Sequence, residues 1–138
     1  MSNKIINNTK LIIHNIENQS KEKQLIDLCR RLGYQTRKIK PGDTDSCLGT
    51  IVGIRVPDLI SKKDKAPDGY KLPELIIFSG ISDGELDEFL AEYRNSGIPS
   101  VALKAVVTQH NISWSVYELA KELQRERIAM MFGKKYEV

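Results

Sequence analysis

The sequence of 138 residues lacks the long apolar runs of membrane proteins and the cysteine framework of small secreted domains. No apolar run approaches the roughly 20 residues that cross a bilayer, and the first ten residues do not resemble a secretory signal. The two cysteines, Cys29 and Cys47, form no CxxC pattern and no second pair. We therefore expect a protein of the reducing cytoplasm that makes no membrane contact.

Signatures of catalysis and cofactor binding are equally scarce. The phosphate-binding patterns GxGxxG and GxxxxGK[ST] are both absent, and the histidines His14 and His110 are too isolated to form a metal site. His14-Asn15 and Ser79-Gly80 stand where a phosphotransfer domain would need acidic residues. We therefore predict no catalytic residue, no metal and no cofactor, and we favour a protein that is not an enzyme.

One thiol chemistry stays open as an alternative. Cys47 lies near an expected helix start, which can depress the pKa of a thiol, and His14 could reach the same edge of the sheet as a base. We favour the simpler interpretation, in which Cys47 is a buried structural residue and His14 lies on the surface. Cys29 falls on an apolar helix face and is expected in the core.

The net charge of +3 is too small to indicate nucleic-acid binding, but its distribution is uneven. Residues 1–73 carry 14 Lys and Arg against 8 Asp and Glu, a net charge of +6, whereas residues 74–138 carry 7 against 10, a net charge of −3. Opposed charges, together with the apolar Met130-Met131-Phe132 tail, favour a homodimer. Two solvated faces of opposite sign are the simpler alternative. Without an aromatic strand platform, we do not expect a nucleic-acid partner.

The best-formed unit of the sequence is a strand–helix–strand segment over residues 74–108. Its first apolar run predicts a buried strand. Ser82, with Glu85 three residues later, predicts a helix that begins with a capping box. Gly97 marks the end of that helix, and Leu103 belongs to the next strand. Such a crossover predicts parallel strands covered by helices.

Residues 10–40 form a second unit of the same kind. A shift of 64 residues superimposes the two segments without a gap, which predicts a two-fold internal architecture and leaves common descent open. The shift places Leu11-Ile12-Ile13 on Leu75-Ile76-Ile77, the expected N-cap Asn18 on Ser82, Arg30 on Arg94, Gly33 on Gly97, Ile39 on Leu103 and Lys40 on Lys104.

Three further segments complete the chain. Residues 48–54 predict a short helix in spite of two glycines, with a buried strand as the alternative. The lysine- and proline-rich segment 57–73 predicts an exposed linker. Ser115 and Glu118 predict a second capping box, which begins a last helix with an apolar face.

We therefore predict a single α/β domain over residues 1–138, with a frayed segment 1–9 and halves 10–56 and 74–132 joined by the linker 57–73. Its elements follow the order β-α-β-α-β-α-β-α. Right-handed crossovers and adjacent first strands predict a small open parallel sheet of order 2-1-3-4, flanked by helices.

An open parallel sheet usually binds its ligand outside the carboxyl ends of its middle strands. The candidate ligand-binding residues at that edge are His14, Asn15, Ser79, Gly80, Ser82, Lys104, Thr108, Asn111 and Trp114. Structural roles are the alternative for several of them. Trp114 could pack against Leu119, Asn111 could form a turn and Lys104 could be a solvated strand end. Free N–H groups near Ser82 could bind phosphate, although Ser82 is expected to cap the helix and Asp83 would repel phosphate.

The second half of the chain resembles a family of short, uncharacterised bacterial proteins, the domain of unknown function 3783. The resemblance implies no activity, substrate or cofactor. It rests on Gly80, Glu85-Leu86, Phe89-Leu90, Gly97-Ile98-Pro99, Leu103-Lys104-Ala105-Val106, Thr108, Asn111 and Trp114, with a thinner likeness around Leu48-Gly49 and Gly53-Ile54.

These observations together predict a small binding or protein-interaction module of the cytoplasm. Its partner is an unknown small molecule or protein. The alternative is an enzyme or a binder of nucleotides or phosphates that uses the carboxyl edge of the sheet.

Overall fold

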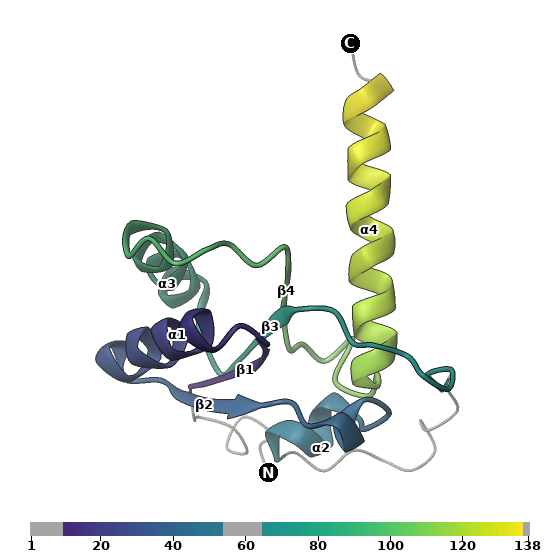
Figure 1. The fold of residues 1–138 in the computed structure, drawn as a ribbon, viewed down its shortest axis with the longest axis horizontal. Helices are drawn as coiled ribbons and strands as arrows, with labels where there is room; N and C mark the ends of the chain where they lie inside the picture. Colours follow the sequence, from purple (N-terminus) through teal and green to yellow (C-terminus); the bar gives the residue numbers. More distant parts are fainter. Residues whose placement is uncertain (1–9, 54–64, 137–138) are drawn as a thin grey trace.

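The computed structural model describes residues 10–53 and 65–136, with side chains up to Met130. The predicted frayed segment 1–9 and residues 57–64 of the predicted linker lie outside the described residues. Strands and helices alternate along the chain as predicted (Figure 1). The elements are β1 (Leu11–Asn15), α1 (Gln19–Leu32), β2 (Gln35–Lys38), α2 (Leu48–Val52), β3 (Leu75–Ser79), α3 (Asp83–Asn95), β4 (Leu103–Val106) and α4 (Val116–Tyr136).

The four strands form one sheet in the predicted order, β2-β1-β3-β4, but the sheet is mixed rather than parallel. Strands β1 and β2 are parallel, as are β3 and β4. The central pair, β1 and β3, is antiparallel. The prediction of a parallel sheet is therefore wrong at its centre and correct within each half.

The path between the halves explains the antiparallel pair. Helix α2 has five residues and spans about 7.5 Å, less than the roughly 17 Å length of a five-residue strand. Strand β3 instead begins beside Asn15, close to where β2 ends. The Asn15 side-chain amide donates hydrogen bonds to the carbonyl oxygens of Leu72 and Pro73, both at 3.0 Å, and so holds the segment that enters β3.

Helices cover both faces of the sheet. One core lies between the sheet and helices α1 and α3, and the other lies between the sheet and helices α2 and α4. Neighbouring residues of β1 alternate between them, so that Ile12 belongs to the first core and Ile13 to the second. Figure 1 shows α1 and α3 next to each other. All five residues of β3 are buried, because this strand has a neighbour on each side and helices on both faces.

The predicted helix boundaries are confirmed by their caps. Ser82 and Glu85 form the reciprocal bonds of a capping box at α3. Ser115 and Glu118 form another at α4. The Asn18 side chain accepts a hydrogen bond from the backbone of α1 at 2.9 Å. The short helix α2 is also confirmed, and its Gly49 N–H bonds the carbonyl oxygen of Ile112 at 2.8 Å, a close approach of two backbones.

The correspondence between the halves holds in part. Ile13 lies opposite Ile77, the residue 64 positions later, so a local two-fold axis passes between them. The 64-residue shift no longer holds beyond Gly97. In the first half Leu11 pairs with Gln35, which lies 24 residues later in the chain. In the second half Leu75 pairs with Leu103, which lies 28 residues later. The second half thus has four extra residues between its helix and its second strand. The expected matches of Ile39 with Leu103 and of Lys40 with Lys104 are therefore wrong.

Helix α4 extends far beyond the sheet (Figure 1). Val116 and Leu119 at its start are buried in the second core. From Gln124 to Met130 every residue is exposed, including Ile128 at 54% and Met130 at 66%. The side chains of the next two residues of the predicted apolar tail lie outside the described part. Within the described chain, no helix combines the length and the apolar character needed to cross a membrane.

Candidate functional site

The predicted crevice does not form as a single site. Asn15 at the end of β1 lies opposite Leu75 at the start of β3, whereas Ser79 at the end of β3 lies opposite Leu11. The antiparallel pair therefore places the candidates after β1 and those after β3 at opposite edges of the sheet. The prediction that both groups line one concavity is wrong for this reason.

His14 lies in the interior rather than on the surface, with 1% of its area exposed. Its Nε2 is 4.0 Å from a carboxylate oxygen of Glu22, and its Nδ1 has no hydrogen-bond partner among the described residues. Burial lowers the pKa of His14; the nearby Glu22 carboxylate raises it in part, and the Lys38 ammonium lowers it further. The imidazole is therefore held in its neutral form.

The thiol alternative has no support from the geometry. His14 belongs to the side of the sheet that faces α1, because it contacts Glu22 of that helix. Cys47 immediately precedes α2 on the other side, is partly buried, and donates from Sγ to the carbonyl oxygen of Ile112 at 3.0 Å. Cys29 is buried in the first core as predicted, and burial raises the pKa of its thiol to about 12.

The candidates after β3 have structural roles. Ser79 is the buried last residue of the strand. Gly80 has a φ of +74°, which suits glycine at this sharp change of direction. Ser82 accepts a hydrogen bond from the Glu85 N–H at 3.2 Å, so its hydroxyl is engaged in capping as expected. This arrangement does not favour phosphate binding there.

Thr108 and Asn111 form a closed turn after β4. The Asn111 carboxamide oxygen accepts from the Thr108 N–H at 2.8 Å, and its amide nitrogen donates to the carbonyl oxygen of Val106 at 3.0 Å. Trp114 is partly buried against the second core and meets the His110 ring edge-to-face at 5.3 Å. These three residues shape the loop between β4 and α4.

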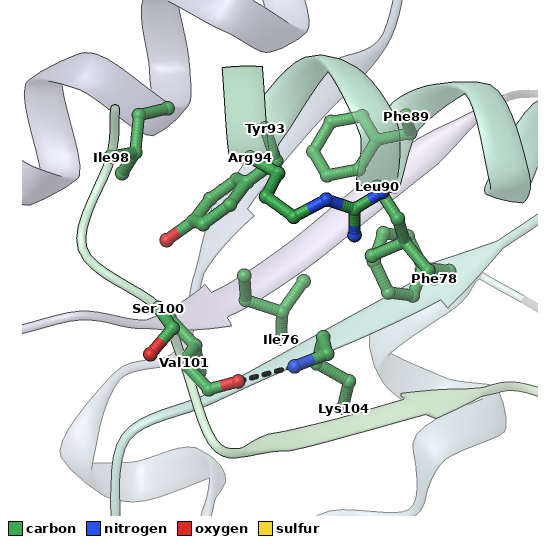
Figure 2. Close-up of a pocket in the computed structure, with 10 residues that line it drawn as sticks. All are labelled: Ile76, Phe78, Phe89, Leu90, Tyr93, Arg94, Ile98, Ser100, Val101 and Lys104. Carbon is green, nitrogen blue, oxygen red and sulfur yellow. Dashed lines mark hydrogen bonds between the residues drawn. The ribbon is translucent and has the colours of Figure 1, made fainter. Parts of the chain in front are cut away.

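Lys104 is the predicted candidate that lines a cavity. The cavity has a volume of about 220 Å³ and lies between α3 and the strands β3 and β4 (Figure 2). Ile76 and Phe78 of β3 and Phe89 of α3 are among its apolar walls and are almost fully buried. The complete lining is Ile76, Phe78, Phe89, Leu90, Tyr93, Arg94, Ile98, Ser100, Val101 and Lys104.

Two cations flank this apolar surface. Figure 2 shows Arg94 extending across the cavity from α3, while Lys104 lies on the strand side with Ile76 between them. Among the described residues the Arg94 side chain has no ion-pair partner. The Lys104 ammonium donates to the carbonyl oxygen of Val101 at 2.5 Å. Burial lowers the pKa of Lys104, although much of its side chain is exposed.

The extra residues of the second half form one wall of the cavity. The Tyr93 hydroxyl donates to the carbonyl oxygen of Pro99 at 2.6 Å, and burial raises the pKa of Tyr93 to about 12. From the first half, Lys21 donates to the carbonyl oxygen of Ser100 at 2.8 Å and to Glu74 at 2.6 Å. The wall is therefore held from both halves of the molecule.

Sequence reasoning predicted Lys104 but missed the rest of the lining. The sequence indicates Arg94 only as the counterpart of Arg30, and it does not mark Phe78, Phe89 and Tyr93 as part of a site. The feature that points to the cavity is the spacing of the strands. The second half has four extra residues between Gly97 and β4, so its connection is longer.

Other concavities in the described chain are less suited to a ligand. A hollow of about 390 Å³ lies beside the exposed part of α4, where Glu74 and Arg127 bring charges of opposite sign. Glu74 already bonds Lys21. Within the described ranges, no three His, Cys, Asp or Glu side chains lie close enough to hold a metal ion.

Comparison with known families identifies the second half. Residues 74–130 match the model of a family described as a domain of unknown function, DUF3783. This part of the chain is therefore similar to the DUF3783 family. The resemblance predicted from the sequence is thus confirmed, and all the residues that line the cavity lie within the DUF3783 segment. No curated protein and no solved structure matches the chain.

Proposed function

We propose that the protein is a small binding module of the cytoplasm, and that its ligand occupies the cavity between α3 and β4. The observation that carries the proposal is the combination of a concave apolar surface with Arg94 and Lys104 at its sides. Ligand sites typically join an apolar lining to a few convergent polar groups. No catalytic role is proposed, because in the described part of the chain the Lys104 ammonium bonds only a backbone carbonyl oxygen and Arg94 has no ion-pair partner.

The alternative of an enzyme or phosphate binder at the carboxyl edge of the sheet has less support. That edge does not exist as a unit, since β1 and β3 end on opposite sides. At the end of β3, Ser82 is occupied by its capping bonds. The proposal therefore moves the site from the edge of the sheet to its α1/α3 face.

A ligand screen with matched variants tests this function. A ligand present at 100 times its Kd stabilises a protein by about 2.7 kcal/mol, which a thermal-shift assay detects readily. We expect the shift to be reduced in an Arg94→Gln, Lys104→Met double variant and retained in Arg30→Gln, which changes an exposed arginine in the corresponding place of the first half. A ligand that stabilises the wild type and the double variant equally would place the site elsewhere.

We also propose that the chain forms a homodimer through the exposed part of α4. Ile128 and Met130 present large apolar side chains to solvent, and the two halves carry net charges of opposite sign. Sedimentation at micromolar concentration, at low and high salt, measures the association. We expect a dimer that Ile128→Ser and Met130→Ser together weaken, and a monomer insensitive to salt would contradict the proposal.

A further inference from the structure

We infer that the ligand of the cavity is a carboxylate bearing one compact apolar group, either aromatic or branched aliphatic. The inference rests on the proposed function and names the chemistry that the cavity would recognise. A free acid and the C-terminal residue of a peptide share this chemistry. The same experiment separates these two sources.

The size of the cavity limits the apolar group. The cavity volume of about 220 Å³ is small for a ligand site. Drug-sized ligands usually need about 300–1,000 Å³. Ile76, Phe78 and Phe89 offer the group a firm surface, because each is packed in the first core. One phenyl or branched aliphatic group suits a space of this size.

The positive charges of Arg94 and Lys104 favour an anionic ligand. A neutral ligand would displace water from Lys104, whose ammonium group has only a carbonyl oxygen as its partner in the described structure. Removing water from a charge is costly unless an opposite charge or hydrogen bonds replace it. A carboxylate supplies that charge, and its two oxygens also match the planar donor pattern of Arg94. Cationic ligands would be repelled by both groups.

The wall of the cavity disfavours phosphate. Phosphate sites gather free backbone N–H groups at the start of a helix or in a glycine-rich loop. Here the wall formed by the extra residues presents carbonyl oxygens, which accept from Tyr93, Lys21 and Lys104. The start of α3, at Asp83, does not line the cavity. A singly charged carboxylate therefore fits the site better than a phosphate.

The first half supplies a natural control for these arguments. Its corresponding arginine, Arg30, lies 3.6 Å from Asp27 and does not line the cavity. The residue after its helix end, Tyr34, is buried and packs on Phe89 with ring centres 5.7 Å apart. Substitution of Arg30 changes the same charge in the same kind of helix turn without touching the cavity.

The test compares three free probes and one peptide on the full chain. The probes are 3-phenylpropionate, its alcohol 3-phenylpropanol and phenylphosphonate, and the peptide is an acetylated pentapeptide ending in phenylalanine with a free carboxylate. Methyl NMR signals of Ile76, Ile98 and Val101 report occupation of the cavity. We expect 3-phenylpropionate to bind at least tenfold more tightly than either the alcohol or the phosphonate.

Variants of Arg94 and Lys104 test whether these side chains bind the carboxylate. Arg94→Gln and Lys104→Met should each weaken carboxylate binding by about ten- to a hundredfold, the usual range for a lost charge-assisted hydrogen bond. Arg30→Gln and Lys71→Met should leave it unchanged, because both residues are exposed and outside the cavity. Both cavity substitutions lie at exposed positions, and the comparison of probes on the wild type does not depend on them.

The outcomes separate the two proposals. If the alcohol or the phosphonate shifts the methyl signals at equal or lower concentration than the carboxylate, the ligand class is wrong and the cavity remains a binding site. If none of the probes or the peptide shifts those signals, both proposals fail. Tighter binding of the peptide than of 3-phenylpropionate supports the inference with a polypeptide C-terminus as the source, and the reverse order supports it with a free acid.

Discussion

The two halves of the molecule share one strand–helix–strand plan and differ in how the helix is joined to its second strand. In the first half, β2 begins at Gln35, two residues after Gly33. In the second half, β4 begins at Leu103, six residues after Gly97. Figure 1 shows this longer connection curving away from α3 before it enters β4.

This difference indicates that the candidate site results from a longer connection between helix and strand in the second half, and not from an additional helix or strand. Lengthening a connection by a few residues costs little free energy, and here hydrogen bonds from Lys21 and Tyr93 fix the extra residues. In the second half, the longer connection forms one wall of the cavity beside α3. Four predictions test how far this contrast extends.

The largest effect is expected for the shared core. Phe89→Ala should lower the free energy of unfolding by about 3–5 kcal/mol, because Phe89 is fully buried and packs against the rings of Phe78 and Tyr34. Leu25→Ala, at the corresponding position of the first half, should cost about 2–5 kcal/mol. Since both residues belong to one core, urea unfolding should stay a single transition in both variants. Two separate transitions would show that the halves are independent.

A smaller loss is expected where the first half holds the cavity wall. Lys21→Met leaves the carbonyl oxygen of Ser100 and the carboxylate of Glu74 without their partner. We expect a loss of about 1–3 kcal/mol in urea unfolding, together with weaker probe binding in the cavity. Lys23→Met, at an exposed position of the same helix, is the control. Unchanged binding in Lys21→Met would mean that the wall keeps its shape without the first half.

The halves should also differ in their response to acid. His14 corresponds to Phe78 under the 64-residue shift, and burial lowers its pKa below the usual 6.5, with Glu22 opposing and Lys38 reinforcing the shift. The unfolded chain therefore binds this proton first. The stability is complete above about pH 6.5 and decreases as the pH falls towards the folded pKa, by up to about 1.4 kcal/mol per pH unit.

Unfolding measured between pH 7.5 and 5 checks this expectation. His14→Leu should flatten the part of the profile below pH 6.5, while His110→Leu, at an exposed histidine, should leave the slope unchanged. If the wild type and His14→Leu lose stability in parallel, the buried imidazole is not the responsible group.

The smallest effect is expected at Cys47. This residue forms an antiparallel bridge with Ser115, and each immediately precedes a helix of its own half. Cys47→Ser should change the free energy of unfolding by less than about 0.5 kcal/mol, because a hydroxyl can still donate to Ile112. Alkylation of the folded protein should label Cys47 no faster than a free thiol, and Cys29 only after unfolding. Rapid labelling of Cys47 at pH 6 would reopen the thiol chemistry.

Local features of the fold could be predicted because short-range chemistry determines them. The pairs Ser82 with Glu85 and Ser115 with Glu118 predicted the starts of two helices, and Gly33 predicted the end of one. The strand order followed from the two crossovers. The direction of β3 could not be predicted in this way, because a central strand buried on both faces carries no alternating pattern and reads the same in either direction.

The candidate site was only partly predictable for a related reason. Lys104 could be predicted because it is a charged residue in an otherwise apolar strand. The position of the Arg94 side chain depends instead on the distance between α3 and β4. That distance follows from the four extra residues, which an alignment without gaps concealed. Asn15 was assigned to binding, yet its amide holds the entry to β3. A polar residue after a strand gives no local sign of which role it has.

The antiparallel central pair also governs the electrical polarity of the fold. In a parallel sheet all crossover helices point the same way, and the positive ends of their dipoles gather at one edge. Here α1 and α3 each run against their own strand, and since β1 and β3 are opposed, the helices are opposed as well. Their dipoles cancel across the local two-fold axis and leave neither edge of the sheet with a combined positive field. No helix N-terminus in the described chain lines the cavity, so the positive charge there comes from the side chains of Arg94 and Lys104.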